Sequence, residues 1–127
     1  MTDDRQTIGV SEKSGSTLEA LVDAGVFSQQ VDAAKLALSV ALAHGDEPVE
    51  SQERTTKWNV GTFDQNGDVR ELILCFKPEC QTPYREAENL VECGLRRLAE
   101  HLESHGQLDL EVLLNEIPKS QEEDAQG

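Results

Sequence analysis

The chain has 127 residues, of which 25 are acidic and 11 basic, giving a formal net charge of −14. This charge disfavours nonspecific binding to nucleic acids and to anionic membrane surfaces, because both are held mainly through Lys and Arg. Hydrophobic residues make up 37% of the chain and aromatic residues only 4%. We therefore expect a core of aliphatic side chains, as in packed helices.

Two explanations of the acidity stay open. One is a protein from a high-salt environment, and the other is an acidic surface that meets a basic protein partner. The three cysteines, Cys75, Cys80 and Cys93, are an odd number, and the chain shows neither a secretory signal nor an apolar run long enough for a membrane span. We expect a reducing, cytoplasmic location and no membrane contact.

A short strand and two helices are expected in a first module, residues 6–45. Thr7–Val10 can form the strand. Ser16 and Glu19 match a capping box, in which the two residues satisfy each other's free backbone N–H groups. The first helix is therefore expected to begin at Ser16 and to stop at Gly25.

The second helix is expected to run from a cap at Ser28 through Gln29 to about His44, with Gly45 ending it. Residues 31–43 are apolar on almost every side of a helix. Such a helix needs enclosure all round, which in a small protein indicates a homodimer in which a second subunit covers it.

A polar linker at 46–56 precedes an expected β-hairpin. Apolar and polar residues alternate from Trp58 to Thr62, and Asn66-Gly67 is a tight-turn pair. The returning strand is expected over Val69–Phe76.

The longest helix is expected to start with Thr82 as cap and Pro83 at its first position, and to stop at Gly106. Its apolar stripe comprises Tyr84, Ala87, Val91, Leu95, Leu98 and Leu102. A short final helix is expected after a cap at Asp109. The whole pattern predicts an α+β fold, predominantly α, in one compact domain over residues 1–117, with 57–117 holding the hairpin and later helices, and a disordered acidic tail at 118–127.

A zinc site is the first chemistry to consider, because Cys75-x4-Cys80 and His101-x3-His105 supply Cys2His2 ligand types. Twenty residues separate Cys80 from His101, whereas about 12 to 15 are usual. We therefore expect no metal or cofactor, but a buried Cys75, a surface Cys80 and two solvated histidines.

The segment from Asp64 to Asp68 resembles the start of a calcium loop, but its glycine, Gly67, is fourth instead of sixth, and position twelve is Cys75 instead of Glu. We interpret it as the hairpin turn. The sequence also contains no nucleophile elbow, phosphate-binding glycine loop or HExxH pattern. It predicts no catalytic residue, and we expect a protein that is not an enzyme.

A DNA-binding alternative follows from the order of strand, helix and helix, which is that of ribbon-helix-helix dimers. Their strands pair across the dimer and insert outward side chains into the major groove. Arg5 and Thr7 would read the bases here. Against this, the strand contains Gly9 and is flanked by acidic residues, including Asp4 and Glu12.

Three segments carry a resemblance to a known family: Val26-Phe-Ser28, the alanine-rich Ala33 to Gly45, and Glu88-Asn-Leu-Val-Glu-Cys-Gly-Leu95. Over about Val10 to Leu114 the chain resembles the small Dnd system-associated proteins, which are encoded beside bacterial and archaeal DNA phosphorothioation genes. The resemblance implies a helper in DNA modification or phage defence that acts with larger partners, and it implies no catalytic residue. The leading hypothesis is thus a non-enzymatic accessory or adaptor protein with a protein partner, and the alternative is the DNA-binding regulator.

Overall fold

The structure is a computed structural model that describes residues 4–45 and 53–115. Its elements are β1 (Thr7–Val10), α1 (Glu12–Asp23), α2 (Gln30–His44), β2 (Thr55–Asn59), α3 (Val60–Phe63), α4 (Asp68–Phe76), α5 (Pro83–His105) and α6 (Leu110–Asn115). The predicted α+β layout, mainly helical with a small sheet, is confirmed. The predicted tail and most of the predicted linker lie outside the described residues.

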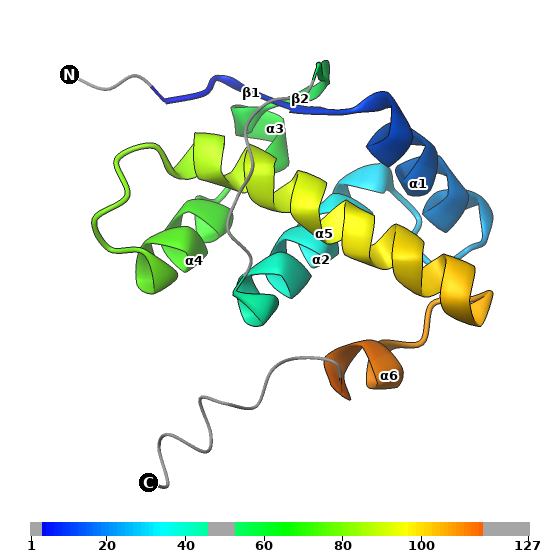
Figure 1. The fold of residues 1–127 in the computed structure, drawn as a ribbon. Helices are drawn as coiled ribbons and strands as arrows, with labels where there is room; N and C mark the ends of the chain where they lie inside the picture. Colours follow the sequence, from blue (N-terminus) through cyan, green and yellow to red (C-terminus); the bar gives the residue numbers. More distant parts are fainter. Residues whose placement is uncertain (1–3, 46–52, 116–127) are drawn as a thin grey trace, which may run out of the picture.

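Helix α5 is the axis on which the other elements pack (Figure 1). It begins at Pro83 after Thr82 and ends before Gly106, whose φ of 74° is readily adopted by glycine, so both predicted ends are confirmed. Its buried apolar residues include Ala87, Leu90, Val91, Leu95 and Leu98. No helix within residues 4–45 and 53–115 is long and apolar enough to cross a membrane.

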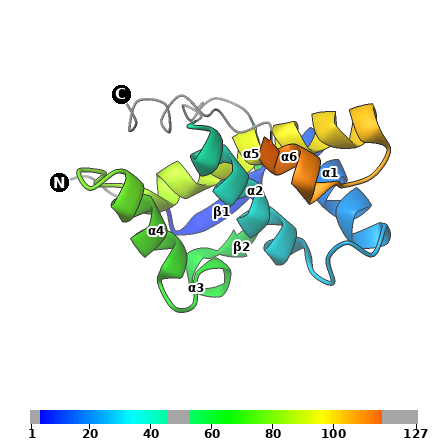
Figure 2. The ribbon, with the colours of Figure 1, turned by 90° about the horizontal axis from the view of Figure 1, so that it is seen from below.

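The alanine-rich helix α2 crosses α5 at very close range (Figures 1 and 2). A β-carbon added to Gly94 would stand 1.8 Å from the carbonyl oxygen of Ala37, so only glycine fits at this point. Within α2, only Asp32, Ser39 and Ala43 are exposed. Because this one chain encloses the helix, the enclosure argument for a dimer along α2 no longer holds.

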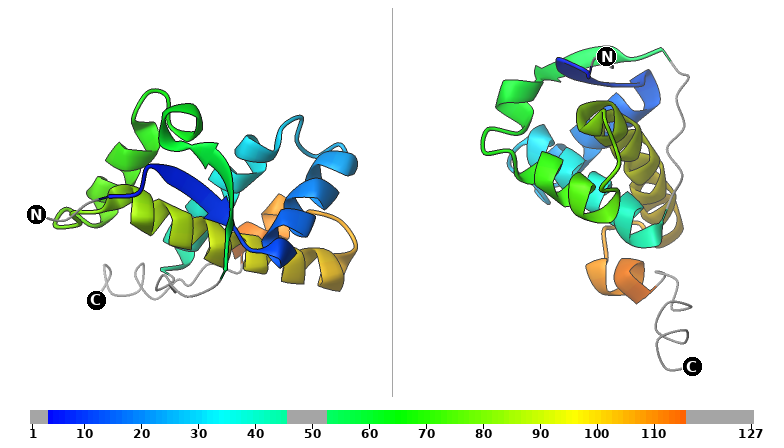
Figure 3. Two further views of the ribbon diagram at one scale, coloured as in Figure 1. Left: turned by 90° about the horizontal axis from the view of Figure 1, so that it is seen from above. Right: turned by 90° about the vertical axis from the view of Figure 1, so that its left-hand side faces the viewer.

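The sheet pairs β1 with β2 in antiparallel order, with Ile8 opposite Trp58 and a register shift after Ile8. The two strands lie along α5 on the side opposite α6 (Figures 1 and 3). Ile8 and Val10 face the core, whereas β2 is largely exposed. An antiparallel pair is thus present, but its partner is the N-terminal strand, and the predicted pairing within 57–76 is wrong.

Helix α4 occupies the segment predicted as the returning strand. Val69, Leu72, Ile73 and Phe76 recur at the spacing of one helical face, and this periodicity dominates over the β-propensity of the segment. Val69 and Ile73 are buried as α4 packs on α5. The helical spacing of these residues was therefore present in the sequence, but the neighbouring Asn66-Gly67 pair favoured the interpretation as a hairpin.

The residues before α4 form its start instead of a hairpin turn. The carboxylate of Asp64 accepts hydrogen bonds from the backbone N–H groups of Val69 (3.0 Å) and Arg70 (3.1 Å). Gly67 precedes the helix with φ 77°. Asp64 thus supplies the acceptor that the free N–H groups of a first helical turn need.

The cap of helix α1 lies five residues before the predicted cap, Ser16. Ser11 is its cap and accepts a hydrogen bond from the N–H of Ser14 at 3.2 Å, while Ser16 lies inside the helix and donates to the carbonyl of Glu12. The capping-box prediction is wrong because Ser11 is fixed by a contact with α5, described below. The cap of α2 is also displaced by one residue, to Gln29.

Candidate functional site

Three polar residues of α5 are buried where the helix faces β1 and α1. Glu88 is 5% exposed, Asn89 4% and Glu92 2%. We name this set the α5 polar cluster. Carboxylates are almost never buried without partners, so the hydrogen bonds of this cluster decide its role.

The carboxylate of Glu92 binds the N-terminus of α1. It accepts hydrogen bonds from the backbone N–H of Ser11 (3.1 Å), the Ser11 hydroxyl (2.7 Å) and the Ser14 hydroxyl (2.8 Å). Burial alone would raise the pKa of Glu92, but these bonds and the charge of Arg54 outweigh it and hold the pKa below its ordinary value. Glu92 therefore acts as an internal anion at a helix N-terminus.

Glu88 binds the sheet in a similar way. It accepts a hydrogen bond from the N–H of Gly9 at 2.8 Å and forms ion pairs with Arg54 (3.2 Å) and Arg5 (3.3 Å). Arg54 also donates to the side-chain oxygen of Asn89 at 2.7 Å. The α5 polar cluster thereby joins α5 to β1, to α1 and to the residue just before β2.

These contacts argue against catalysis by the cluster. Glu92 is next to two serine hydroxyls, which is the arrangement of a nucleophile and a base. A base with a lowered pKa is weak near neutral pH, and here both hydroxyls are buried together with the carboxylate. We interpret the cluster as an anchor of the fold.

A second polar network holds the start of α5. The Asp4 carboxylate accepts hydrogen bonds from the N–H groups of Tyr84 and Arg85, both at 2.9 Å, and the Tyr84 hydroxyl donates to Asp64 at 2.9 Å. Burial, together with the hydrogen bond to Asp64, raises the pKa of Tyr84 to about 12. For Asp64, burial is outweighed by bonds from Val69, Arg70 and Tyr84, which lower its pKa.

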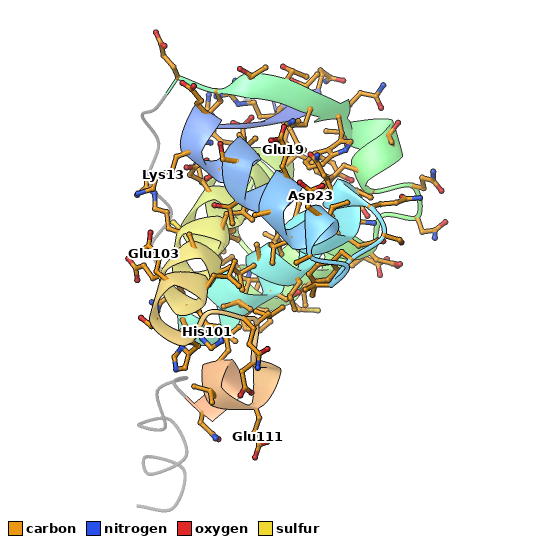
Figure 4. All side chains as sticks on the ribbon, turned by 90° about the vertical axis from the view of Figure 1, so that its right-hand side faces the viewer. Lys13, Glu19, Asp23, His101, Glu103 and Glu111 are labelled. Carbon is orange, nitrogen blue, oxygen red and sulfur yellow. The ribbon has the colours of Figure 1, made fainter. Side chains whose placement is uncertain are left out.

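A groove of about 270 Å³ lies between α1 and α5 above Glu92. Its lining residues are Ser11, Lys13, Ser14, Thr17, Glu92, Leu95, Arg96, Ala99, Glu100 and Glu103. Arg96 extends toward Glu92 at 3.8 Å, and Lys13 and Glu103 lie at the outer rim (Figure 4). The groove is lined by side chains of both charge signs, Lys13 and Arg96 as well as Glu92, Glu100 and Glu103.

The end of α4 presents an exposed large hydrophobic side chain. Phe76 is 56% exposed, and it is followed by a turn with a shallow hollow lined by Lys77, Pro78, Glu79, Cys80 and Glu86. Lys77 forms an ion pair with Glu86. We name residues 75–80 the α4-end surface. Within the described residues, Val26 is the other large hydrophobic side chain that is exposed, at 42%.

The two residues expected to read DNA have partners within the chain. Arg5 pairs with Glu88, and Thr7 lies opposite Asn59 in the β1–β2 ladder. A ribbon-helix-helix dimer would pair this strand with its copy. Here one edge of β1 is used by β2, and the N–H of Gly9 is used by α5.

Cys75, Cys80 and His101 lie differently from expectation, whereas His105 is exposed as predicted. Cys75 is exposed and Cys80 is half-buried against the core, the reverse of the prediction, because α4 is a helix and not a strand. His101 is buried instead of solvated, and its ring stacks on that of His105 with centroids 4.3 Å apart. Within the part of the chain that the structure describes, no group of three or more His, Cys, Asp or Glu residues could hold a metal ion.

Comparisons of the chain with protein-family models, with curated protein sequences and with solved structures found no match. Glu88, Asn89 and Glu92 were not identified as partners of α1 and the sheet from the sequence. The sequence did contain an indication of these contacts. Glu88 and Glu92 are one helical turn apart on the flank of the apolar stripe that includes Leu95.

Proposed function

We propose that this protein is a non-enzymatic accessory or adaptor protein that binds a protein partner through the α4-end surface. The observation that carries the proposal is Phe76, whose aromatic side chain is more than half exposed and which is followed in the chain by a shallow hollow lined by residues 77–80 and Glu86. Aromatic side chains at the centre of an interface contribute much of its binding energy.

The position of Phe76 supports a binding role. Val69 and Ile73, on the same helical face, are buried against α5, so the stripe of α4 continues past the core into solvent. A single exposed apolar residue is normal in a soluble protein, but here Pro78 and Cys80 line the hollow in the turn that follows Phe76.

The partner that fits this surface has an apolar anchor flanked by basic residues. Glu79 is exposed at the rim, and the chain as a whole carries a net charge of −14. Complementary charge of this kind favours rapid association and excludes acidic competitors. The resemblance to Dnd system-associated proteins supports a setting in which the partner is a larger protein of DNA modification or phage defence.

The test uses tagged Phe76→Ser with Val26→Ser as the matched control, since both remove an exposed hydrophobic side chain. The unmodified chain and both variants would be used to capture proteins from the source cells. A protein that is captured by the unmodified chain and by Val26→Ser, but not by Phe76→Ser, would then be purified and titrated against all three chains. We expect Phe76→Ser to weaken binding by about tenfold or more and Val26→Ser to leave it unchanged.

Folding must be unaffected for this result to count. Removal of an exposed side chain changes the free energy of unfolding by about 0.5 kcal/mol or less, which urea denaturation would verify. Equal binding by Phe76→Ser and the unmodified chain would overturn the proposal. Salt-sensitive binding to duplex DNA that is lost with Arg5→Gln would favour the DNA-binding regulator instead.

A further inference from the structure

His101 makes an unusual hydrogen bond for a buried histidine. The residue is 4% exposed, and its Nε2 accepts a hydrogen bond from the backbone N–H of Asp109 at 2.9 Å. A ring nitrogen that accepts carries no proton, so the proton of the neutral ring is on Nδ1. That Nδ1 is buried and has no hydrogen-bond partner among the residues that the structure describes.

Asp109 is the residue from which α6 begins. Its side chain accepts from the N–H of Val112 at 3.2 Å, and its carbonyl oxygen accepts from the N–H of Leu113 at 3.0 Å. Leu113 of α6 is 2% exposed and belongs to the core. The bond from Asp109 to His101 therefore fixes both the start of α6 and the position of Leu113.

We propose that His101 is a pH-sensitive latch that holds α6 against α5 when its ring is neutral and releases it when the ring is protonated. An imidazolium donates from both nitrogens and accepts at neither. Protonation would place an Nε2–H against the N–H of Asp109, in a site with little access to water. The bond would be lost and two donors would face each other, which the folded arrangement avoids by undocking α6.

His105 and Asp109 are titratable groups in contact with His101. His105, also on α5, is stacked on the His101 ring and contacts the His101 carbonyl through Nδ1 at 3.1 Å. The Asp109 carboxylate is the group that could pair with an imidazolium, but doing so would remove it from Val112 and uncap α6. Glu111 is exposed and points away from α5 (Figure 4).

The experiment measures amide hydrogen exchange of the full chain at about pH 7.5 and at about pH 5.5, a range in which imidazole changes charge. After correction for the intrinsic rates, we expect protection over residues 109–113 to fall by about tenfold at the lower pH, the effect of losing one hydrogen bond. Protection in the middle of α5 should stay the same.

Two variants test whether His101 causes the loss of protection over residues 109–113. His101→Gln places an amide oxygen near the position of Nε2 and does not titrate, so α6 should stay protected at both pH values. His105→Gln should keep the pH response. Unchanged protection over 109–113 in the unmodified chain, an equal response in His101→Gln, or loss of the response in His105→Gln would each overturn the proposal.

An independent measurement on the unmodified chain covers the case in which His101→Gln does not fold. NMR titration should show the Asp109 amide resonance shifting with the same midpoint as the His101 ring protons, because the two groups share one hydrogen bond. A midpoint shared with His44 or His105 alone would contradict the latch.

Discussion

Glu92 of α5 accepts hydrogen bonds from both the backbone N–H and the hydroxyl of Ser11, 81 positions earlier in the chain. This contact places the start of α1 and the end of β1 on the central helix. A neutral side chain would accept these bonds less strongly. We expect Glu92→Gln to lower the free energy of unfolding by about 2 kcal/mol in urea denaturation, whereas Glu100→Gln, on the exposed face of α5, should change it by less than about 0.5 kcal/mol. Equal effects would show that the contact with Ser11 is not stabilising.

The lowered pKa values of Glu92 and Asp64 predict how stability depends on acid. Each carboxyl has a folded-state pKa below its ordinary value of 4.5 or 3.8, so its contribution is complete above those values and is lost as the pH falls below them. The difference in unfolding free energy between the unmodified chain and Glu92→Gln should therefore be largest near neutrality and shrink as the pH falls below 4.5. A difference independent of pH would contradict the ionised state of Glu92.

At Gly94 we expect that even the methyl side chain of alanine does not fit. Gly94→Ala would place a β-carbon 1.8 Å from the carbonyl oxygen of Ala37, so α2 and α5 must separate. We expect a loss of about 3 kcal/mol in thermal or urea unfolding, despite the better helix propensity of alanine. The matched control is Gly15→Ala in α1, where the nearest side-chain atom lies 3.9 Å from the new carbon, and stability should rise by about 0.5 kcal/mol. A neutral Gly94→Ala would mean that the two helices cross less closely.

Tyr84 offers a direct spectroscopic test because it is the single tyrosine of the chain. Its ultraviolet absorbance should titrate with a midpoint of about 12, and Asp64→Asn should move that midpoint toward 10.0 by removing the acceptor charge. Asp68→Asn, in the exposed first turn of α4, is the control. Since the folded-state pKa is raised, the stabilisation is complete below the ordinary value and is lost as the pH rises through about 12. A midpoint near the ordinary value, with circular dichroism showing a folded chain, would rule out the bond to Asp64.

The two arginines that contact Glu88 should differ in importance. The Arg54 side chain is 10% exposed and that of Arg5 is 47% exposed. Arg54→Gln leaves a buried carboxylate without its enclosed cation, and we expect a loss of about 3 kcal/mol. Arg5→Gln removes an ion pair that solvent screens, so it should lower the free energy of unfolding by less than about 1 kcal/mol. The stability of this variant should depend little on salt concentration. The reverse order in urea denaturation would contradict the proposed arrangement around Glu88.

Local chemistry was sufficient to predict part of this fold. The start of α5 at Pro83, the stops at Gly45 and Gly106 and the cap of α6 at Asp109 are all decided by the backbone preferences of one or two residues. The alternating residues around Trp58 likewise indicated a strand. The helix ends require no distant partner, which is why a single sequence was enough for them. The pairing of the strand around Trp58 with β1 does require one, and it was not predicted.

The errors fall where distant contacts compete with local preferences. Val69–Phe76 has helical spacing and β-prone residues at once, and packing of Ile73 against α5 selects the helix. With that segment helical, β2 pairs with β1 instead. The start of α1 moved to Ser11 for a related reason, because the acceptor that fixes it is on α5.

The sequence by itself determined both ends of α5, the stop of α2, the cap of α6, the helical stripe of α5 and an acidic surface, since these depend on residue type and spacing along the chain. Only the tertiary structure decided that Glu88 and Glu92 are buried and that His101 meets Asp109. It also decided that Phe76 is exposed while Ile73 is not. Burial and pairing of a side chain depend on which elements pack against it, and no local pattern within one helix specifies its neighbour.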